Sequence, residues 1–239
     1  MQFIIGVFAV PIGYLLSFLY GFLNNYGLTL VVLTIIVRLC LFPLYSSQVK
    51  HTVKMADLQP KMTALQKKYA NDKETLNIKM MELYKEEKFN PMRGCLPMLI
   101  QMPIIFGLFA LLRNPLDYIN DPSLVMAVHE SMFWVSDLSQ PDNWILPLGA
   151  GLATYVSFSQ TQAQQAGDSG AANPAQGMMN GMKYFFPVMI FLMGRSFPAG
   201  LALYWFVGNL IQIGQNRYLN VMRKKLKEKQ ADEKKKKKK

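Results

Sequence analysis

The chain has 239 residues, 51% of them hydrophobic, and a formal net charge of +11, yet its mean hydropathy is only +0.12. This mean averages two populations, because 22 of the 26 basic residues lie within residues 50–93 and 217–239, while four long stretches carry almost no charge. A soluble globular domain would intersperse its charges, and a chain disordered beyond its ends would hold fewer apolar and aromatic residues. The composition excludes both classes and predicts a polytopic membrane protein.

The first segment, residues 1–25, has two interpretations. Residues 3–23 carry no charge and are long enough to span, but Pro11 interrupts them and a very short connection separates them from the next apolar stretch. A secretory signal would have a basic start and a small-residue cleavage site, and neither is present. We expect an amphipathic helix that lies in the membrane interface, with a sixth span or an uncleaved anchor as the alternative.

Five apolar stretches follow that can cross a hydrocarbon core about 30 Å thick. We predict transmembrane helices at residues 26–49, 93–113, 144–162, 182–197 and 199–218. Pro198 lies between the last two and predicts a tight hairpin at the membrane surface. The apolar centre of the fourth span, residues 184–194, would cover only about 16 Å as a helix, and so short a span can thin the bilayer around it.

The segments between the spans differ in pattern and composition. Residues 50–92 contain apolar residues at helical spacing in two runs, 58–69 and 76–83, and predict a cytoplasmic helical hairpin. The alternative for this segment is a solvated spacer held by its own apolar seam. Residues 163–181 are rich in Gln, Ala, Gly and Asn, which is typical of a flexible linker.

Basic residues orient the chain, because Lys and Arg accumulate in cytoplasmic loops. The hairpin segment and the tail, residues 219–239, are strongly basic, whereas residues 114–143 contain five acidic residues and no Lys or Arg. Five spans place the two basic segments on one side and the acidic loop on the other. We therefore expect the N-terminus outside, residues 114–143 as an extracytoplasmic loop, and the C-terminus in the cytoplasm.

Arg38 is the deepest charge in the predicted spans. It lies eleven residues after Gly27 and twelve before Lys50, which on a helix is roughly 16–18 Å from either mark. A cation near the bilayer centre costs about 2.5–3.5 kcal/mol on insertion scales. One interpretation is that its side chain snorkels to the inner surface, helped by Pro43. The other is that Arg38 faces a water-filled cavity.

Polar residues on other spans favour the cavity. Thr34 lies one turn before Arg38, and Gln101 adds an amide from the second span. Ser157 and Gln160 share one face of the third span. A stripe at i, i+4, i+7 and i+11 follows the fifth span: Trp205, Asn209, Gln212 and Asn216. Each amide taken alone more often joins helices than lines a cavity. No span contains Asp or Glu, so the sequence favours a cavity open inward and to lipid, in which Arg38 attracts an anionic visitor.

Three motifs follow one another along the chain: LTIIVRLCLFPL with its following basic loop, NPMRGCLPMLIQMPIIFGLFALL, and FPAGLALYWFVGN. In this order they resemble the motifs of the YidC family of membrane-protein insertases, and the resemblance covers nearly all of residues 26–218. It implies an all-α polytopic membrane protein with five transmembrane helices around a hydrophilic groove, an N-terminal interfacial helix and a cytoplasmic helical hairpin.

The resemblance also implies groove residues. The family's groove arginine falls on Arg38, its neighbouring threonine on Thr34, and the aromatic position of its fifth-span motif on Trp205, beside Tyr204. Combined with the polar faces above, the candidate substrate-binding residues are Arg38, Thr34, Gln101, Ser157, Gln160, Tyr204, Trp205, Asn209 and Gln212.

The function implied is insertion and chaperoning of nascent membrane proteins at a bacterial cell membrane, by the protein alone or with the Sec translocon. A hydrophilic leading segment would pair with Arg38 while its hydrophobic partner slides into lipid past the first and fifth spans. The sequence contains no phosphate loop, so we expect no ATP dependence. The chain resembles the short bacterial form without a lipid anchor, since Cys40 lies inside a span, and without an extra span and periplasmic domain.

Two other classes of function are less consistent with the sequence. A transporter or channel would use Arg38 as an anion site, but no inverted repeat is visible. An intramembrane enzyme would need catalytic groups at depth, whereas His51 and His129 lie outside the predicted spans. Cys40 and Cys95 have no accompanying His, so we expect no catalysis, no cofactor and no metal.

The lysine-rich tail has three interpretations: it binds ribosomal RNA, it binds the anionic inner leaflet, or it is a disordered run of charge that only fixes orientation. We expect the protein to work as a monomer, with nascent chains and the lipid bilayer as its partners.

Overall fold

A computed structural model describes residues 2–90, 96–114, 117–118, 122–165 and 174–236. Within these residues the chain is helical, apart from one isolated bridge between Met132 and Val135, which confirms the predicted all-α class. The helices are α1 (Gln2–Leu23), α2 (Tyr26–Lys68), α3 (Lys73–Glu86), α4 (Leu96–Arg113), α5 (Pro122–Ala127), α6 (Ile145–Gln165), α7 (Pro174–Gly194) and α8 (Ala199–Lys236).

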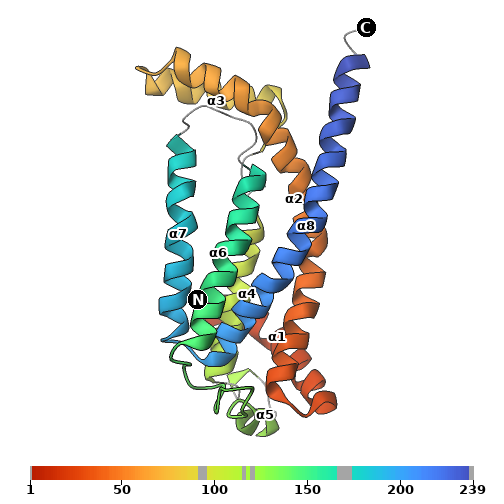
Figure 1. The fold of residues 1–239 in the computed structure, drawn as a ribbon, viewed down its shortest axis with the longest axis vertical. Helices are drawn as coiled ribbons and strands as arrows, with labels where there is room; N and C mark the ends of the chain where they lie inside the picture. Colours follow the sequence, from red (N-terminus) through yellow and green to blue (C-terminus); the bar gives the residue numbers. More distant parts are fainter. Residues whose placement is uncertain (1, 91–95, 115–116, 119–121, 166–173, 237–239) are drawn as a thin grey trace.

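The helices form an upright bundle with a crosspiece at one end (Figure 1). Helix α8 packs on both α2 and α6, α6 packs on α7, and α1 packs on α4 and α2. The last part of α2 bends over to lie with α3 at the end where α8 finishes, and α5 lies at the opposite end (Figure 1). Pro43 and Pro60 lie inside α2, and each removes one helical hydrogen bond, which is a usual cause of such bending.

Length and composition make two helices candidate membrane spans. The most apolar windows are Gly6–Leu23 in α1, with mean hydropathy 1.8, and one in α2 with mean hydropathy 2.3. Helices α4 and α7 contain shorter apolar stretches, Leu99–Arg113 and Gly181–Gly194. Whether α1 crosses the membrane or lies in the interface stays a prediction.

The outer faces of the bundle are apolar. On α6, Leu148, Leu152 and Val156 recur at i+4 spacing, and each is more than 40% exposed. Phe185 and Val188 are exposed in the same way on α7. Rows of large exposed apolar side chains are unfavourable in water and are typical of surfaces that face lipid or a partner protein.

Helices continue across three of the predicted segment bounds. Helix α2 runs without a break past residue 49, and α8 runs past residue 218 as far as Lys236, so the described part of the tail is helical. The bounds themselves, which mark the membrane surfaces, stay predictions. Helices α6 and α7 take up most of the predicted linker, leaving residues 166–173 outside the described residues. Lys, Gln, Met and Ala are good helix formers, so a change of side-chain polarity does not by itself end a helix.

The end of α2 and α3 form a hairpin with its own small core. Leu58 and Met62 of α2 are buried against Leu83 of α3 and Phe89 after it. Asp72 begins α3, and its Oδ1 accepts a hydrogen bond from the backbone N–H of Thr75 at 3.0 Å. The predicted apolar spacing therefore corresponds to one seam between two antiparallel helices.

Glu130, in the loop between α5 and α6, ties that loop to the start of α2. Its Oε2 accepts the backbone N–H of Tyr26 at 2.6 Å, and its Oε1 accepts the hydroxyl of Tyr20. Helix N-termini have unpaired N–H groups and a positive dipole end, so a carboxylate is favourable there. Met132 of the same loop packs on Gly27, where a Cβ would lie 2.8 Å from the Met132 Cβ.

We expect Glu130→Ala to lower the free energy of unfolding by about 1–3 kcal/mol, because the Tyr26 N–H and the Tyr20 hydroxyl lose this acceptor. Thermal unfolding of the purified protein in detergent measures the change. Glu86→Ala removes an exposed acid from α3 and should leave the midpoint nearly unchanged. Equal losses in the two variants would contradict the role of Glu130.

Candidate functional site

A cavity of about 330 Å³ lies among α2, α4, α6, α7 and α8, and we call it the five-helix cavity. Four of these helices contribute polar side chains, whereas the described lining residues of α7 are Met182, Phe186 and Ile190. The polar lining residues are Arg38, Tyr45, Gln48, Thr52, Gln101, Thr154, Ser157, Thr161, Asn209, Gln212, Asn216 and Arg223, with Trp205 beside them.

The side chain of Arg38 extends from α2 to α8, and the residue is only 5% exposed. Its Nη1 donates to Oε1 of Gln212 at 2.9 Å and to the hydroxyl of Tyr45 at 3.4 Å, while its Nε has no hydrogen-bond partner among the described residues. Gly208 provides the room, because a Cβ there would lie 2.8 Å from Arg38 Nη2. The guanidinium is thus partly satisfied by α8 and has donor capacity left for the cavity.

The other amides of α8 join it to α6. Asn209 Nδ2 donates to Thr154 Oγ1 at 3.0 Å, and its Oδ1 accepts the Ser157 hydroxyl at 2.6 Å. Asn216 Nδ2 reaches the Ser157 carbonyl at 3.4 Å and Thr161 Oγ1 at 3.3 Å. The polar stripe of α8 therefore divides: Asn209 and Asn216 hold two helices together, and Gln212 meets Arg38.

The remaining predicted residues take different positions. Gln101 Nε2 donates to the Tyr204 hydroxyl at 2.9 Å, and Gln101 lines the cavity while Tyr204 lies buried behind it. Thr34 is fully buried, and its hydroxyl donates to the Leu30 carbonyl at 2.6 Å rather than lining the cavity. Gln160 is also not among the lining residues, and its Oε1 has no partner among the described residues.

Sequence reasoning missed several residues of the site. Tyr45 follows Arg38 by seven positions, so helical spacing could have found it. Arg223 extends the polar stripe seven positions beyond Asn216 but was counted with the basic tail. Gly208 had no signal in the sequence, because its importance depends on which side chain crosses it.

The described lining residues include two charged side chains, Arg38 and Arg223, and both are cations. Within the described part of the chain, the ion pairs join other residues: Lys61 with Glu87, Lys79 with Glu82, and His129 with Asp137. Burial lowers the pKa of Arg223, but a guanidinium titrates so far above neutrality that it stays protonated. The arrangement suits polar or anionic groups.

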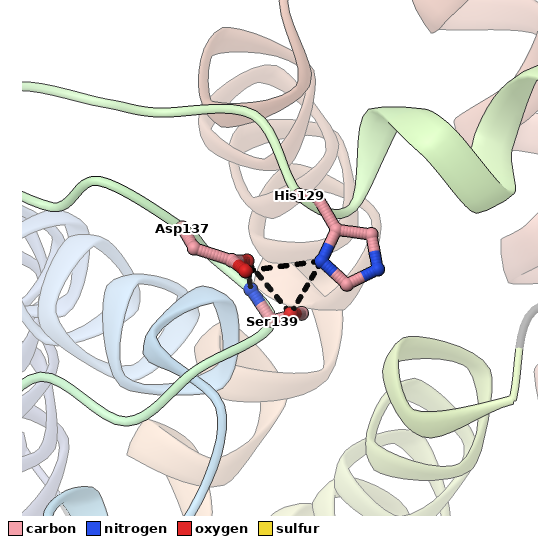
Figure 2. Close-up of polar contacts among 3 residues, drawn as sticks. All are labelled: His129, Asp137 and Ser139. Carbon is pink, nitrogen blue, oxygen red and sulfur yellow. Dashed lines mark hydrogen bonds and ion pairs between the residues drawn. The ribbon is translucent and has the colours of Figure 1, made fainter.

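A Ser-His-Asp cluster lies outside the cavity, in the loop between α5 and α6 (Figure 2). His129 Nδ1 is 3.0 Å from both Asp137 Oδ2 and Ser139 Oγ, and the Ser139 hydroxyl donates to Asp137 Oδ1 at 2.7 Å. A nucleophilic triad needs the serine and the carboxylate on opposite nitrogens of the imidazole. Here both contact the same nitrogen, so the geometry fastens a loop and does not activate a nucleophile.

Comparisons with known proteins identify the family of the chain. Residues 18–236 match the family described as 60Kd inner membrane protein. The chain is 36% identical over 216 residues to the membrane protein insertase YidC of Geobacter sp. (strain M21), and 38% identical over 218 residues to that of Cupriavidus necator. The chain belongs to the YidC family.

The matches cover most of this chain but less than half of each YidC relative. Each of these matches covers 90% of this chain but only 37% or 36% of the relative. A solved structure of an active YidC insertase, with its first transmembrane domain resolved, superposes with a TM-score of 0.62 at 27% identity and covers 86% of this chain and 44% of that one. The chain therefore spans less than half the length of these relatives, and the family resemblance read from the motifs is confirmed.

We expect Asn209→Ala to destabilise this YidC-family bundle by about 1–3 kcal/mol, because it leaves the hydroxyls of Ser157 and Thr154 without their partner on α8. Gln212→Ala is the matched control on the same helix. It should cost less, because water in the cavity can replace its bond to Arg38. Thermal unfolding in detergent compares the two, and the reverse order of stability would contradict the division of the stripe.

Asp137 gives the loop a pH dependence. Partial burial raises the pKa of Asp137, but the hydrogen bonds from His129 and Ser139 outweigh it, and the net pKa lies below the ordinary value. A lowered pKa in the folded state stabilises above the unfolded pKa of about 3.9, and this contribution disappears as the pH falls through the lower folded value.

Asp137→Asn should therefore unfold at a lower temperature than the parent chain at about pH 7, and the gap should shrink toward about pH 3. Thermal unfolding at both pH values tests this. Asp117→Asn, at an exposed position between α4 and α5, should show no gap at either pH. A gap for Asp137→Asn that is independent of pH would contradict the electrostatic origin.

Proposed function

We propose that this chain is a membrane-protein insertase and chaperone that takes nascent membrane proteins from the cytoplasm into the bilayer through the five-helix cavity. It acts without ATP, alone or with the Sec translocon, and without catalysing a reaction. It crosses a bacterial cell membrane five times, with the N-terminus outside and the C-terminus in the cytoplasm. The relatives named as insertases support the proposal, and Arg38 carries it: a buried cation beside a cavity whose described lining contains no carboxylate.

The shape of the cavity favours a slide over a pore. Its polar lining continues past Gln48 and Thr52 of α2, toward the basic hairpin and tail. In the other direction Leu30, Leu108 and Leu201 are at most 1% exposed and fill the bundle. A hydrophilic segment could enter from the basic end, but it would meet no polar path to the acidic loop. We take the basic end to be cytoplasmic because basic segments stay inside.

A client would leave the cavity into lipid between α4 and α7. The route past the first and fifth spans stays a prediction, and we propose the other route because α2 and α8 are packed together. The described residues of α4 and α7 make no extensive contact with each other. Burial of the client's apolar segment drives the transfer, and the membrane potential adds about 2.3 kcal/mol per charge per 100 mV for an acidic segment moving outward.

The lysine-rich tail would bring clients to the basic end of the five-helix cavity. Because α8 is helical as far as Lys236, it carries the described part of the tail to the same end of the bundle as the hairpin (Figure 1). Ribosomal RNA is the partner we propose for it, with the anionic inner leaflet as the competing surface.

We expect Arg38→Ala to reduce insertion of a client with an acidic leading segment by about tenfold, the equivalent of one lost charge-assisted hydrogen bond. The measurement is protease protection of the client in liposomes that contain only the purified protein. Gly208→Ala keeps the charge but pushes the guanidinium off α8, and should give a smaller loss. A client whose acidic residues are replaced by Asn should be insensitive to both variants. Equal insertion by Arg38→Ala and the parent protein would contradict the role of Arg38.

A further inference from the structure

Arg223 is a second buried cation of the five-helix cavity. It is 8% exposed, lines the cavity, and has no hydrogen-bond partner for its Nε among the described residues. The neighbouring basic residues of α8, Arg217, Lys224 and Lys225, are all exposed. One arginine of the basic tail is thus turned inward while those around it face away.

Among the described residues that line the cavity, Arg223 has no anionic partner. The lining residues near it along α2 and α8 are uncharged, and include Val49, Thr52 and Leu219. A guanidinium in such a place loses hydration, and hydrogen bonds to an ionised partner are among the stronger ones that it can regain. An anion that enters the cavity would supply that partner.

The spacing between the two arginines limits what can bind both. Arg38 contacts α8 at Gln212. Arg223 lies eleven residues after Gln212 on the same helix, which corresponds to roughly 16 Å along its axis. At this separation one carboxylate cannot contact both guanidinium groups, so the two cations act as separate sites. An extended chain advances about 3.3 Å per residue and covers the distance in about five residues.

We propose that Arg223 is a second anion-binding residue of the cavity, and that with Arg38 it selects client segments carrying two carboxylates about five residues apart. This specificity rests on the proposed insertase function. A segment with one carboxylate would bind either at Arg223 or at Arg38. A segment with two carboxylates at this spacing would bind at both arginines together.

Binding to the purified full chain in nanodiscs of zwitterionic lipid tests the proposal without requiring insertion. The probes are fluorescein-labelled Gly-Ser peptides with two Asp residues, either adjacent or about five positions apart, and fluorescence anisotropy at low ionic strength reports the Kd. The spaced peptide should bind the parent protein roughly three- to tenfold more tightly than the adjacent one. Arg223→Gln should remove this preference, Arg223→Lys should keep most of it, and Arg217→Gln should leave it unchanged.

Three results would overturn the proposal. Arg223→Gln could weaken both peptides equally, or Arg217→Gln could act like Arg223→Gln, which would leave only non-specific attraction to a basic tail. A loss that occurs only with anionic lipid in the nanodisc would assign Arg223 to a lipid phosphate instead. Near-UV circular dichroism of Arg223→Lys and Arg223→Gln verifies that both variants are folded.

Insertion into liposomes then separates this proposal from the function on which it rests. If the parent protein inserts no client above empty liposomes, the insertase function fails while the peptide preference still stands or falls by itself. If the parent inserts clients but does so equally for adjacent and spaced carboxylates, the two-site specificity fails and the insertase function remains.

Discussion

The contact between Arg38 and Gln212 constrains the rest of the bundle. A buried guanidinium must be hydrogen-bonded or hydrated, because removing a charge from water costs several kcal/mol. Gln212 supplies one acceptor, and the cavity leaves space for others. The contact requires α8 to come close to α2, which Gly208 permits, and it requires α8 to be held in that rotation. Asn209, on the same polar stripe of α8, does this through its bonds to α6. The same helix therefore uses one amide for the cavity and another for its own position.

The two ends of α8 differ in their contacts and in their side chains, and this difference gives the five-helix cavity one polar end. At its start, the backbone N–H groups of Ala199 and Gly200 donate to the carbonyls of Gln140 and Leu138, each at 2.9 Å. This fastens α8 to the loop between α5 and α6. Toward its other end α8 carries polar residues that line the five-helix cavity, and then basic residues. On the proposed insertase function, a hydrophilic segment that enters from the basic end finds polar partners along α8, as a slide would require.

Much of the fold and of the cavity lining could be predicted from the sequence. The depth of a charge within a span and the spacing of residues along a helix are both properties of single helices. Arg38 and the stripe on α8 follow directly from counting residues. Which amides pair with which could not be predicted, since this depends on how α6 and α8 are rotated against each other. Thr34 shows the same limit: it lies one turn from Arg38, yet its buried hydroxyl is satisfied by the Leu30 carbonyl. Helices α2 and α8 run past the predicted membrane bounds at residues 49 and 218, because a membrane surface changes the side chains that a helix needs and leaves its backbone bonds unchanged.

The continuity of α2 and α8 decides which wall of the cavity can give way. Both helices run unbroken from the core into the hairpin and the tail, and beyond the Arg38 contact they are packed together again at Val49, Val53 and Leu219. Two contacts along one helix pair fix both its spacing and its crossing, so widening the cavity there would expose apolar surface and unpair a buried cation at once. Helix α7 has no such double attachment, because it packs mainly on α6. On the proposed insertase function, the cost of opening is therefore lowest on the side of α7, where the exposed apolar face meets the surroundings that a client's hydrophobic segment would enter.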